Sequence, residues 1–207
     1  MHKLSHAAWI TVVALGLMSA FIEEAPATGA AGDVKAAAVA TPVLYERAAA
    51  KAHPRSMPEA GEVHSHGLLD RVARRMQGGL LPETQATEES RRAIDALRAY
   101  AATRDGAHYK EALRRVMHLA SWDPRGASGY ALAAEDSRTV AWALALGFDW
   151  LEPRLEAAQK DQLLGVLRVR AADLKRDTSP DSTATLTAIL TLVAGDMPDA
   201  RVWVVQN

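Results

Sequence analysis

The sequence predicts an all-α fold built from antiparallel helix pairs. Of the 207 residues 42 are alanine, and hydrophobic residues make up 49% of the chain while aromatic residues make up only 5%. Alanine and leucine are the strongest helix formers, whereas strands favour β-branched and aromatic residues. Long segments carry apolar residues at helical spacing, and the short connections between them are typical of antiparallel neighbours. Such pairs build either a solenoid or a closed (α/α) toroid, and periodicity alone leaves both open.

Charge and composition exclude several classes of protein. The chain has 24 Lys and Arg against 25 Asp and Glu, a formal net charge of −1, and no cysteine. Balanced charge argues against a nucleic-acid-binding protein that works by bulk positive charge. The lack of cysteine excludes disulfides, cysteine-ligated metals and cysteine nucleophiles. No Walker loop, dinucleotide fingerprint, G-x-S-x-G or H-E-x-x-H motif is present. We therefore expect no cofactor and no metal.

Residues 1–30 predict an export signal. The short segment Met1-His2-Lys3 precedes an uncharged run from Ala7 to Phe21, and Ala25-Pro26-Ala27 supplies an A-x-A cleavage pattern. The uncharged run is shorter than the about 20 residues that a membrane-spanning helix needs. An uncleaved membrane anchor is the alternative. We expect a periplasmic or secreted protein with no stable membrane insertion after the signal is cleaved.

The next part of the chain, residues 31–86, is expected to form a linker and N-terminal helices. An alanine- and glycine-rich stretch leads to Thr41-Pro42, a typical helix start, and predicts a helix to about Lys51. Residues 53–67 have the composition of a loop. A short helix is expected over 68–77, stopped by Gly78-Gly79.

Regular helical patterning begins at Thr87, and residues 87–207 are expected to form one partial α/α-toroid domain. Asp105-Gly106 predicts a turn, a loop is expected over 123–133, and Pro153 separates two later segments. A last turn or helix is expected near Pro198. The helices are expected over 87–104, 107–121, 135–151, 156–175 and 182–194.

The helix over 135–151 has two contrasting faces. Its expected core face holds apolar residues, Val140, Leu144 and Leu151. Arg138, Trp142 and Asp149 fall together on the opposite side at about 100° per residue. A cation, an aromatic ring and a carboxylate in one row suit an anionic sugar, because the indole stacks on the sugar ring while arginine pairs with its carboxylate. The alternative is a partly buried Arg–Asp pair with the tryptophan as packing.

Other polar patterns give weaker functional signals. Thr183, Thr187 and Thr191 form a stripe that suits either a polar cleft or an ordinary helix–helix contact. His64-Ser65-His66 has a spacing that zinc sites use, but no third ligand stands nearby, so a solvated loop is expected. His118 is expected to be a surface or second-layer histidine.

Three sets of motifs together resemble the heparinase II/III-like polysaccharide lyases. Leu119–Pro124 (LASWDP) and Gly147–Leu151 (GFDWL), with Glu135-Asp136-Ser137-Arg138 between them, are similar to the family's WDP–G loop and YDWL helix end. Pro180–Thr183 followed by Ala194–Trp203 looks like the family's DSH and AGD-PEA-W segment. His53-Pro54-Arg55 is similar to the His-Pro-Arg that often opens the domain. The similarity spans about residues 87–207 in consistent order.

The resemblance implies an exported (α/α) toroid that acts on uronic-acid polysaccharides by β-elimination. In that reaction a base removes the proton next to the uronate carboxylate, and an acid protonates the departing glycosidic oxygen. The carboxylate must be neutralised, because its charge makes the adjacent C–H a very weak acid. We therefore expect an anionic polysaccharide or oligosaccharide as the partner. The expected substrate-binding residues are Trp122, Arg138, Trp142 and Asp149.

The chain also departs from the family pattern. Thr183 stands where the family's DSH segment has a histidine, and threonine cannot carry a proton at neutral pH. Tyr130 is the one tyrosine near a plausible cleft, and the sequence ends at Asn207 without the family's catalytic tyrosine region and β-sandwich. No catalytic residue is assigned. We expect the N-terminal portion of a lyase that is inactive alone. The alternatives are a non-catalytic periplasmic carbohydrate-binding or scaffold protein, and a glycoside hydrolase using Asp123 and Asp136.

Overall fold

The computed structural model describes residues 45–63, 67–197 and Trp203. These residues contain helices and no strand, and the helices pack against one another, which confirms the predicted all-α class. The predicted export signal, the linker that follows it, the pair His64 and His66, and the last turn near Pro198 lie outside the described residues.

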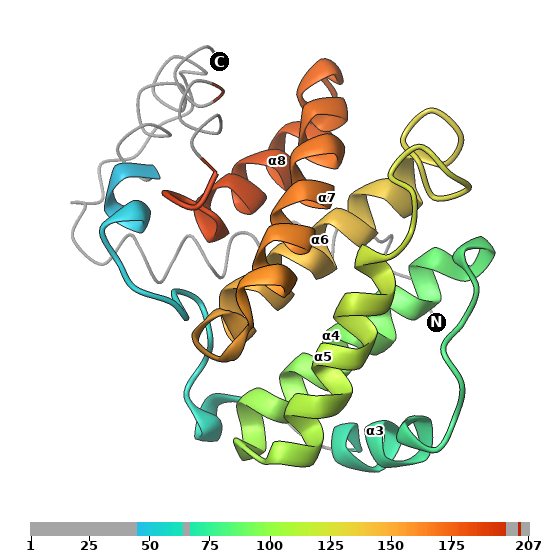
Figure 1. Cartoon of the computed structure of the whole chain (residues 1–207), viewed down its shortest axis with the longest axis vertical. Coiled ribbons are helices and arrows are strands. Elements are labelled where there is room, and N and C mark those ends of the chain that lie inside the picture. The colour runs from blue at the N-terminus through green and yellow to red at the C-terminus, as the bar shows by residue number, and fades with distance from the viewer. Residues whose placement is uncertain (1–44, 64–66, 198–202, 204–207) are drawn as a thin grey trace, which may run out of the picture.

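Short connections join α4 to α5, α6 to α7 and α7 to α8, whereas a longer one, residues 121–133, joins α5 to α6. A helical turn at 45–49 opens the described chain. The elements after it are η1 (Ala60–Glu62), α3 (Leu68–Met76), η2 (Glu83–Gln85), α4 (Ala86–Thr103), α5 (Gly106–Ala120), α6 (Ala134–Leu151), η3 (Glu152–Arg154), α7 (Ala157–Arg176) and α8 (Pro180–Leu192) (Figure 1). The helices predicted from residue 68 onward, up to residue 194, therefore begin and end within two residues of their predicted bounds.

Local chemistry explains the helix ends. Asp105 is the N-cap of α5, and its carboxylate accepts hydrogen bonds from the N–H groups of Ala107 and His108. Ser179 is the N-cap of α8 and accepts from the N–H of Ser182. Pro180 occupies the first turn, where its fixed φ suits a helix and its missing N–H costs nothing. This proline moves the start of α8 two residues ahead of the predicted position.

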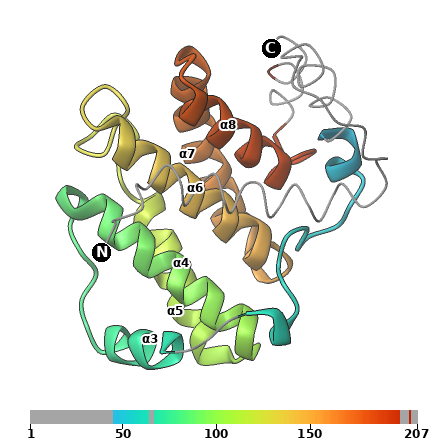
Figure 2. The ribbon, with the colours of Figure 1, turned by 180° about the vertical axis from the view of Figure 1, so that it is seen from behind.

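Helix α6 is the centre of the fold. It packs against α4 and α5 on one side and against α7 and α8 on the other. Figures 1 and 2 show α4 and α5 side by side on one side of α6, with α7 and α8 on the other. Because a short turn joins α4 to α5, the two helices run in opposite directions. Every residue of α6 from Val140 to Leu151 is buried, so burial includes the side that the sequence pattern assigned to polar residues.

Small residues allow this close packing. A Cβ atom on Gly147 of α6 would lie 2.7 Å from both methyl carbons of Val116 on α5. That separation is far below a normal carbon–carbon contact, so the two helices approach where a glycine faces a valine. Alanines continue the buried surface of α6 at Ala141, Ala143 and Ala145.

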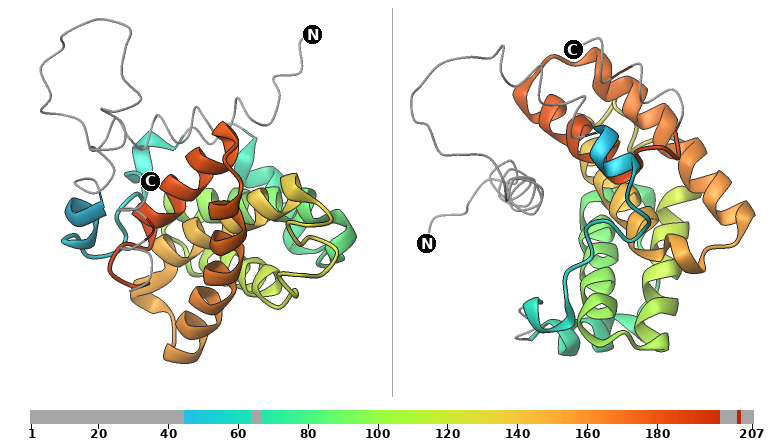
Figure 3. Two further views of the ribbon diagram at one scale, coloured as in Figure 1. Left: turned by 90° about the horizontal axis from the view of Figure 1, so that it is seen from above. Right: turned by 90° about the vertical axis from the view of Figure 1, so that its left-hand side faces the viewer.

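The N-terminal part of the described chain lies against its C-terminal part. Residues 45–49, blue in Figure 3, lie beside the red end of α8. The Tyr45 hydroxyl accepts a hydrogen bond from the N–H of Gly195 at 3.2 Å. The chain then passes through His53 and Arg55 over the C-terminal end of α6, where those residues bind Asp149. Residues 45–63 therefore hold together the C-terminal end of α6 and the segment that follows α8.

Candidate functional site

Polar side chains from three parts of the chain converge beside the start of α8. We call this group the Asp177 cluster, and its members are Tyr130, Arg138, Asp177, Ser179 and Ser182. Oδ2 of Asp177 accepts hydrogen bonds from Ser182 Oγ at 2.6 Å and from Ser179 Oγ at 2.9 Å. The Tyr130 hydroxyl also donates to Oδ2, and the N–H of Ser179 donates to Oδ1 at 2.8 Å. One carboxylate thus receives four hydrogen bonds.

Arg138 adds a cation to the Asp177 cluster. Its Nη1 lies 4.0 Å from Asp177 Oδ2 and 3.4 Å from Ser182 Oγ, which are long contacts for a guanidinium group. The side chains of Arg138 and Asp177 are 20% and 26% exposed, whereas Ser182 is buried. The cluster therefore has a buried hydroxyl beneath a charged pair that solvent reaches.

The hydrogen bonds set the protonation states in the cluster. The bonds from Ser182 and Tyr130 hold the pKa of Asp177 far below its usual 3.8. Burial, followed by the bond to Asp177, raises the pKa of Tyr130 above its usual 10.0. Tyr130 therefore keeps its proton at neutral pH, and its hydroxyl donates a hydrogen bond to the Asp177 carboxylate. A tyrosine held in this way is a poor general base.

A buried arginine anchors the loop that carries Tyr130. The side chain of Arg170 on α7 is fully buried, and its Nη1 and Nη2 donate to the carbonyl and hydroxyl of Ser128, each at 2.9 Å. Glu83 Oε1 in turn accepts from the N–H and hydroxyl of Ser128, at 2.8 and 2.9 Å. The connection between α5 and α6 is therefore held from both sides, two residues before Tyr130.

A second polar group, the His53 network, lies at the C-terminal end of α6. It consists of His53, Arg55, Ser56, Asp149 and Asp196. Oδ1 of Asp149 lies 2.6 Å from His53 Nδ1 and accepts from the N–H of Arg55 at 2.8 Å. Oδ2 of Asp149 accepts from the N–H and hydroxyl of Ser56 at 2.9 and 2.6 Å. Asp149 is fully buried, so these donors replace the water that it loses on folding.

The same network closes the end of α8. Arg55 donates to the carbonyls of Leu192 and Ala194, each at 2.6 Å, and to Asp196 Oδ2 at 3.2 Å. His53 Nε2 lies 2.9 Å from the same oxygen of Asp196. The side chain of His53 is only 5% exposed. We interpret this network as structural, because its polar groups bind one another and the carbonyls at the end of α8, and His53, Arg55 and Asp149 are buried.

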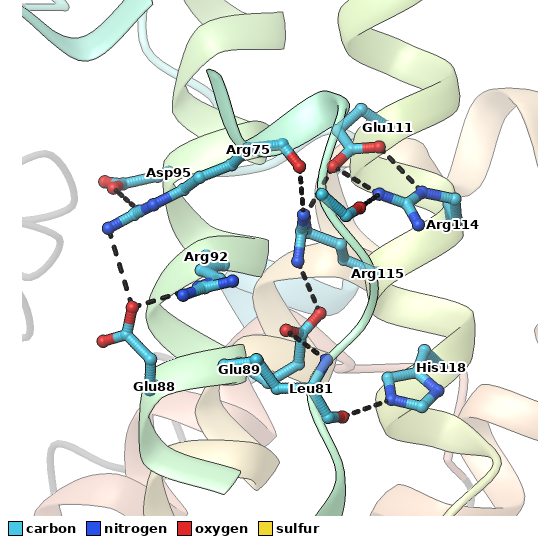
Figure 4. Close-up of polar contacts among 11 residues, drawn as sticks. Arg75, Leu81, Glu88, Glu89, Arg92, Asp95, Glu111, Arg114, Arg115 and His118 are labelled. Atoms are coloured by element: carbon cyan, nitrogen blue, oxygen red, sulfur yellow. Dashed lines mark hydrogen bonds and ion pairs between the residues drawn. The ribbon is translucent and has the colours of Figure 1, made fainter. Parts of the chain in front are cut away.

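A third group joins α3, α4 and α5 (Figure 4). Arg115 donates to Glu89 at 2.7 Å, to Glu111 at 2.6 Å and to the carbonyl of Arg75 at 3.0 Å. Arg115 is 1% exposed and Glu89 is fully buried. His118 Nε2 is hydrogen bonded to the Leu81 carbonyl at 2.7 Å, so this half-buried histidine helps to hold the connection before α4.

The structure separates the four predicted substrate-binding residues. Arg138 lies in the Asp177 cluster with an accessible side chain. Trp122 and Trp142 are buried, with exposed fractions of 8% and 3%, and Trp122 stacks edge-on against the ring of His118. Asp149 is bound in the His53 network. Trp142 therefore packs inside the fold, as the packing alternative expects. The Arg–Asp pair of that alternative does not form, because Arg138 lies beside Asp177 whereas Asp149 binds His53, Arg55 and Ser56.

Three other residues singled out from the sequence have defined places. Thr183 is exposed and follows Ser182, and its carbonyl accepts a hydrogen bond from Thr187. Asp123 accepts from the N–H of Arg125, and Asp136 accepts from the Thr87 hydroxyl. Asp123 thus holds a local turn, and Asp136 joins the start of α6 to the start of α4.

The sequence pattern missed Asp177, Ser179 and Arg170. Arg170 does carry a signal, because it shares a helical stripe with Leu163, Leu167 and Leu174, all buried. An arginine on an apolar stripe indicates a buried cation with dedicated acceptors. Asp177 has no comparable signal: Ser179 and Ser182 are near it in the sequence, but Tyr130 and Arg138, which complete the cluster, come from distant parts of the chain.

Comparison of the sequence with protein-family models and with curated proteins finds no match. Among the described residues, no helix has both the length and the apolar character needed to cross a bilayer. Within the same residues, no group of three or more histidine and acidic side chains is arranged to hold a metal ion.

Proposed function

We propose that this chain is the helical, glycan-binding portion of an exported polysaccharide lyase of the heparinase II/III-like type. In this proposal α4 to α8 form part of an (α/α) toroid. The Asp177 cluster binds uronic-acid-containing polysaccharides or oligosaccharides in the periplasm or outside the cell. The chain by itself binds these glycans without cleaving them.

The observation that carries the glycan-binding proposal is the accessible Arg138 beside a set of hydroxyl groups. A guanidinium group pairs with carboxylates, and its two contacts in the cluster are long enough to leave it able to bind a further anion. The exposed Thr183 adds another hydroxyl group next to Ser182. A uronic acid presents a carboxylate next to hydroxyl groups, which is the complementary pattern.

The positions of the family-like motifs support the link to polysaccharide lyases. His53 and Arg55 of the His-Pro-Arg segment contact Asp149 of the GFDWL helix end. The same two residues contact Asp196 of the AGD segment. Near the other end of α6, Tyr130 follows the WDP loop and contacts Ser182, which belongs to the Pro180–Thr183 segment that resembles the family's DSH. Motifs that are far apart in sequence thus join in two polar groups, as expected if they belong to one inherited fold.

The chemistry of the cluster argues against β-elimination by this chain alone. The reaction needs a base whose pKa lies near the working pH. Tyr130 has a raised pKa, and Thr183 has no proton to exchange at neutral pH. This favours the alternative of a non-catalytic carbohydrate-binding or scaffold protein as the second candidate.

The experiment is incubation of the purified chain with oligosaccharides from heparan sulfate and alginate. Saturable binding is measured by calorimetry, and cleavage by the ultraviolet absorbance of the unsaturated uronate product. We expect binding without product. Absence of binding to every uronate glycan contradicts the proposed function, and rapid product formation contradicts the proposed inactivity. Adding the C-terminal catalytic segments of a heparinase II/III-like lyase separates the two candidates, since only a lyase portion then gains cleavage.

A further inference from the structure

The Asp177 carboxylate has more donors than a helix cap requires. The capping of α8 is already done by Ser179, which accepts from the N–H of Ser182. Of the bonds to Asp177, the one from the N–H of Ser179 is a local turn contact. The bond from the Ser179 hydroxyl belongs to the same turn, and the remaining two come from the hydroxyls of Tyr130 and Ser182. Capping and turn formation therefore leave these two hydroxyl bonds unexplained.

Most of these donors are held in place independently of Asp177. Tyr130 belongs to the loop that Arg170 anchors through Ser128. Ser182 is a buried residue in the first turn of α8, and Arg138 projects from α6. The N-terminus of α8 also carries a partial positive charge close to the carboxylate. Hydroxyls, a guanidinium group and a helix N-terminus that converge on one point form an arrangement that suits a carboxylate.

We propose that Asp177 is the internal ligand of a carboxylate-binding site formed by Tyr130, Arg138, Ser179 and Ser182. In this role Asp177 competes with the uronate carboxylate of a bound glycan for the same donors, and its charge repels that carboxylate. Asp177 thereby limits the affinity of the cluster for uronates. The identity of the external ligand rests on the proposed function, whereas the carboxylate site itself does not.

The first test uses Asp177→Ala in the full chain, with sodium acetate and sodium formate as probes and sodium chloride at equal ionic strength as the reference. We expect removal of the Asp177 carboxylate to lower Tm and to leave the hydroxyl groups of Tyr130, Ser179 and Ser182 without their acceptor. Acetate or formate at about five times its dissociation constant then raises Tm of the variant by about 2–4 °C. Wild type and Asp161→Ala, which lacks an exposed aspartate of α7, gain nothing beyond the chloride reference.

Asp177→Ser serves the same purpose if the alanine variant does not fold, because serine keeps an acceptor for the N–H of Ser179. A rise in Tm that is specific to carboxylates in either variant supports the inference. The same shift in wild type, or none in the variants, overturns it.

The second test measures binding of a glucuronate oligosaccharide by calorimetry. Loss of the competing charge makes the binding of Asp177→Ala at least about tenfold tighter than that of wild type. Rescue by acetate without tighter glucuronate binding overturns the uronate assignment and counts against the proposed function. Failure of rescue overturns the internal-ligand inference, while glycan binding by wild type still tests the proposed function.

Discussion

His53 Nδ1 lies 2.6 Å from Asp149 Oδ1, although 96 positions separate the two residues in the sequence. The other ring nitrogen lies 2.9 Å from Asp196 Oδ2. The single ring of His53 therefore connects the N-terminal segment, the end of α6 and the turn after α8.

Loss of the Asp149 charge should destabilise the fold strongly. In Asp149→Asn the fully buried site keeps its volume, but an amide nitrogen then faces the donors of His53, Arg55 or Ser56. We expect the free energy of unfolding to fall by about 3–5 kcal/mol, the usual cost of breaking a buried ion pair. Urea denaturation measures it. Asp161→Asn, at an exposed position, should stay within about 0.5 kcal/mol of wild type.

Stability should also depend on pH through His53. Burial lowers the pKa of this histidine, but its bonds to Asp149 and Asp196 raise it more, so it lies above the usual 6.5. A raised pKa stabilises the fold fully below pH 6.5 and loses that effect as pH rises through the folded-state value. The stability difference between wild type and His53→Gln should therefore shrink from pH 6 to alkaline pH. A difference that grows over this range contradicts the account.

Asp196 should make the stability of the fold depend on pH at acid pH. Burial acts to raise the pKa of Asp196, but the bond to His53 and the nearby charges of His53 and Arg55 lower it below the usual 3.8. Its contribution to stability is present above that pH and is lost as pH falls through the lowered value. Unfolding of Asp196→Asn should therefore depend less on pH below about 4 than that of wild type. If the free energy of unfolding changes equally with pH in both proteins below about pH 4, this role of Asp196 is contradicted.

The buried and exposed arginines on α5 should differ in their effect on stability. Arg115→Met leaves the buried Glu89 without its cation and should cost about 3–5 kcal/mol of unfolding free energy. Arg114 pairs with Glu111, but its side chain is 37% exposed, so Arg114→Met should cost less than about 1 kcal/mol. Adding Glu89→Gln to Arg115→Met should recover part of the loss. Equal effects of the two single substitutions contradict the assigned roles.

Replacing two helical glycines by alanine should change the free energy of unfolding in opposite directions. In Gly147→Ala the new methyl group overlaps Val116, so the free energy of unfolding should fall by about 1–3 kcal/mol. A Cβ atom on Gly165 of α7 would meet no neighbouring atom within 4 Å, so Gly165→Ala should raise the free energy of unfolding by about 0.5–1 kcal/mol. Thermal unfolding measures both changes. Adding Val116→Ala to Gly147→Ala should cost less than the sum of the two single changes.

The sequence was sufficient for the helices because their determinants are local. Asp105, the glycines and Pro153 mark boundaries through backbone chemistry that each residue carries with it. The surroundings of α6 could not be predicted in the same way, since Trp142 and Asp149 are covered by segments distant in the sequence. An amphipathic pattern identifies one buried face, but a helix packed on all sides has no exposed face to identify.

In the candidate site, too, one residue could be predicted from the sequence and its contacts could not. Arg138 was predicted as a binding residue and remains accessible in the Asp177 cluster. Its neighbours Tyr130 and Asp177 come from two loops, and their meeting depends on how α6, α7 and α8 pack. No spacing in the sequence encodes that contact.

Titration calorimetry of a glucuronate oligosaccharide into wild type, Arg138→Ala and Arg74→Ala tests the central claim most directly. Arg74 is an exposed arginine on α3 and serves as the matched control. We expect saturable binding to wild type and Arg74→Ala, and binding at least about tenfold weaker to Arg138→Ala, since a charged hydrogen bond contributes about 1.5–3 kcal/mol. Equal affinities for all three proteins, or no binding to wild type, would contradict that claim.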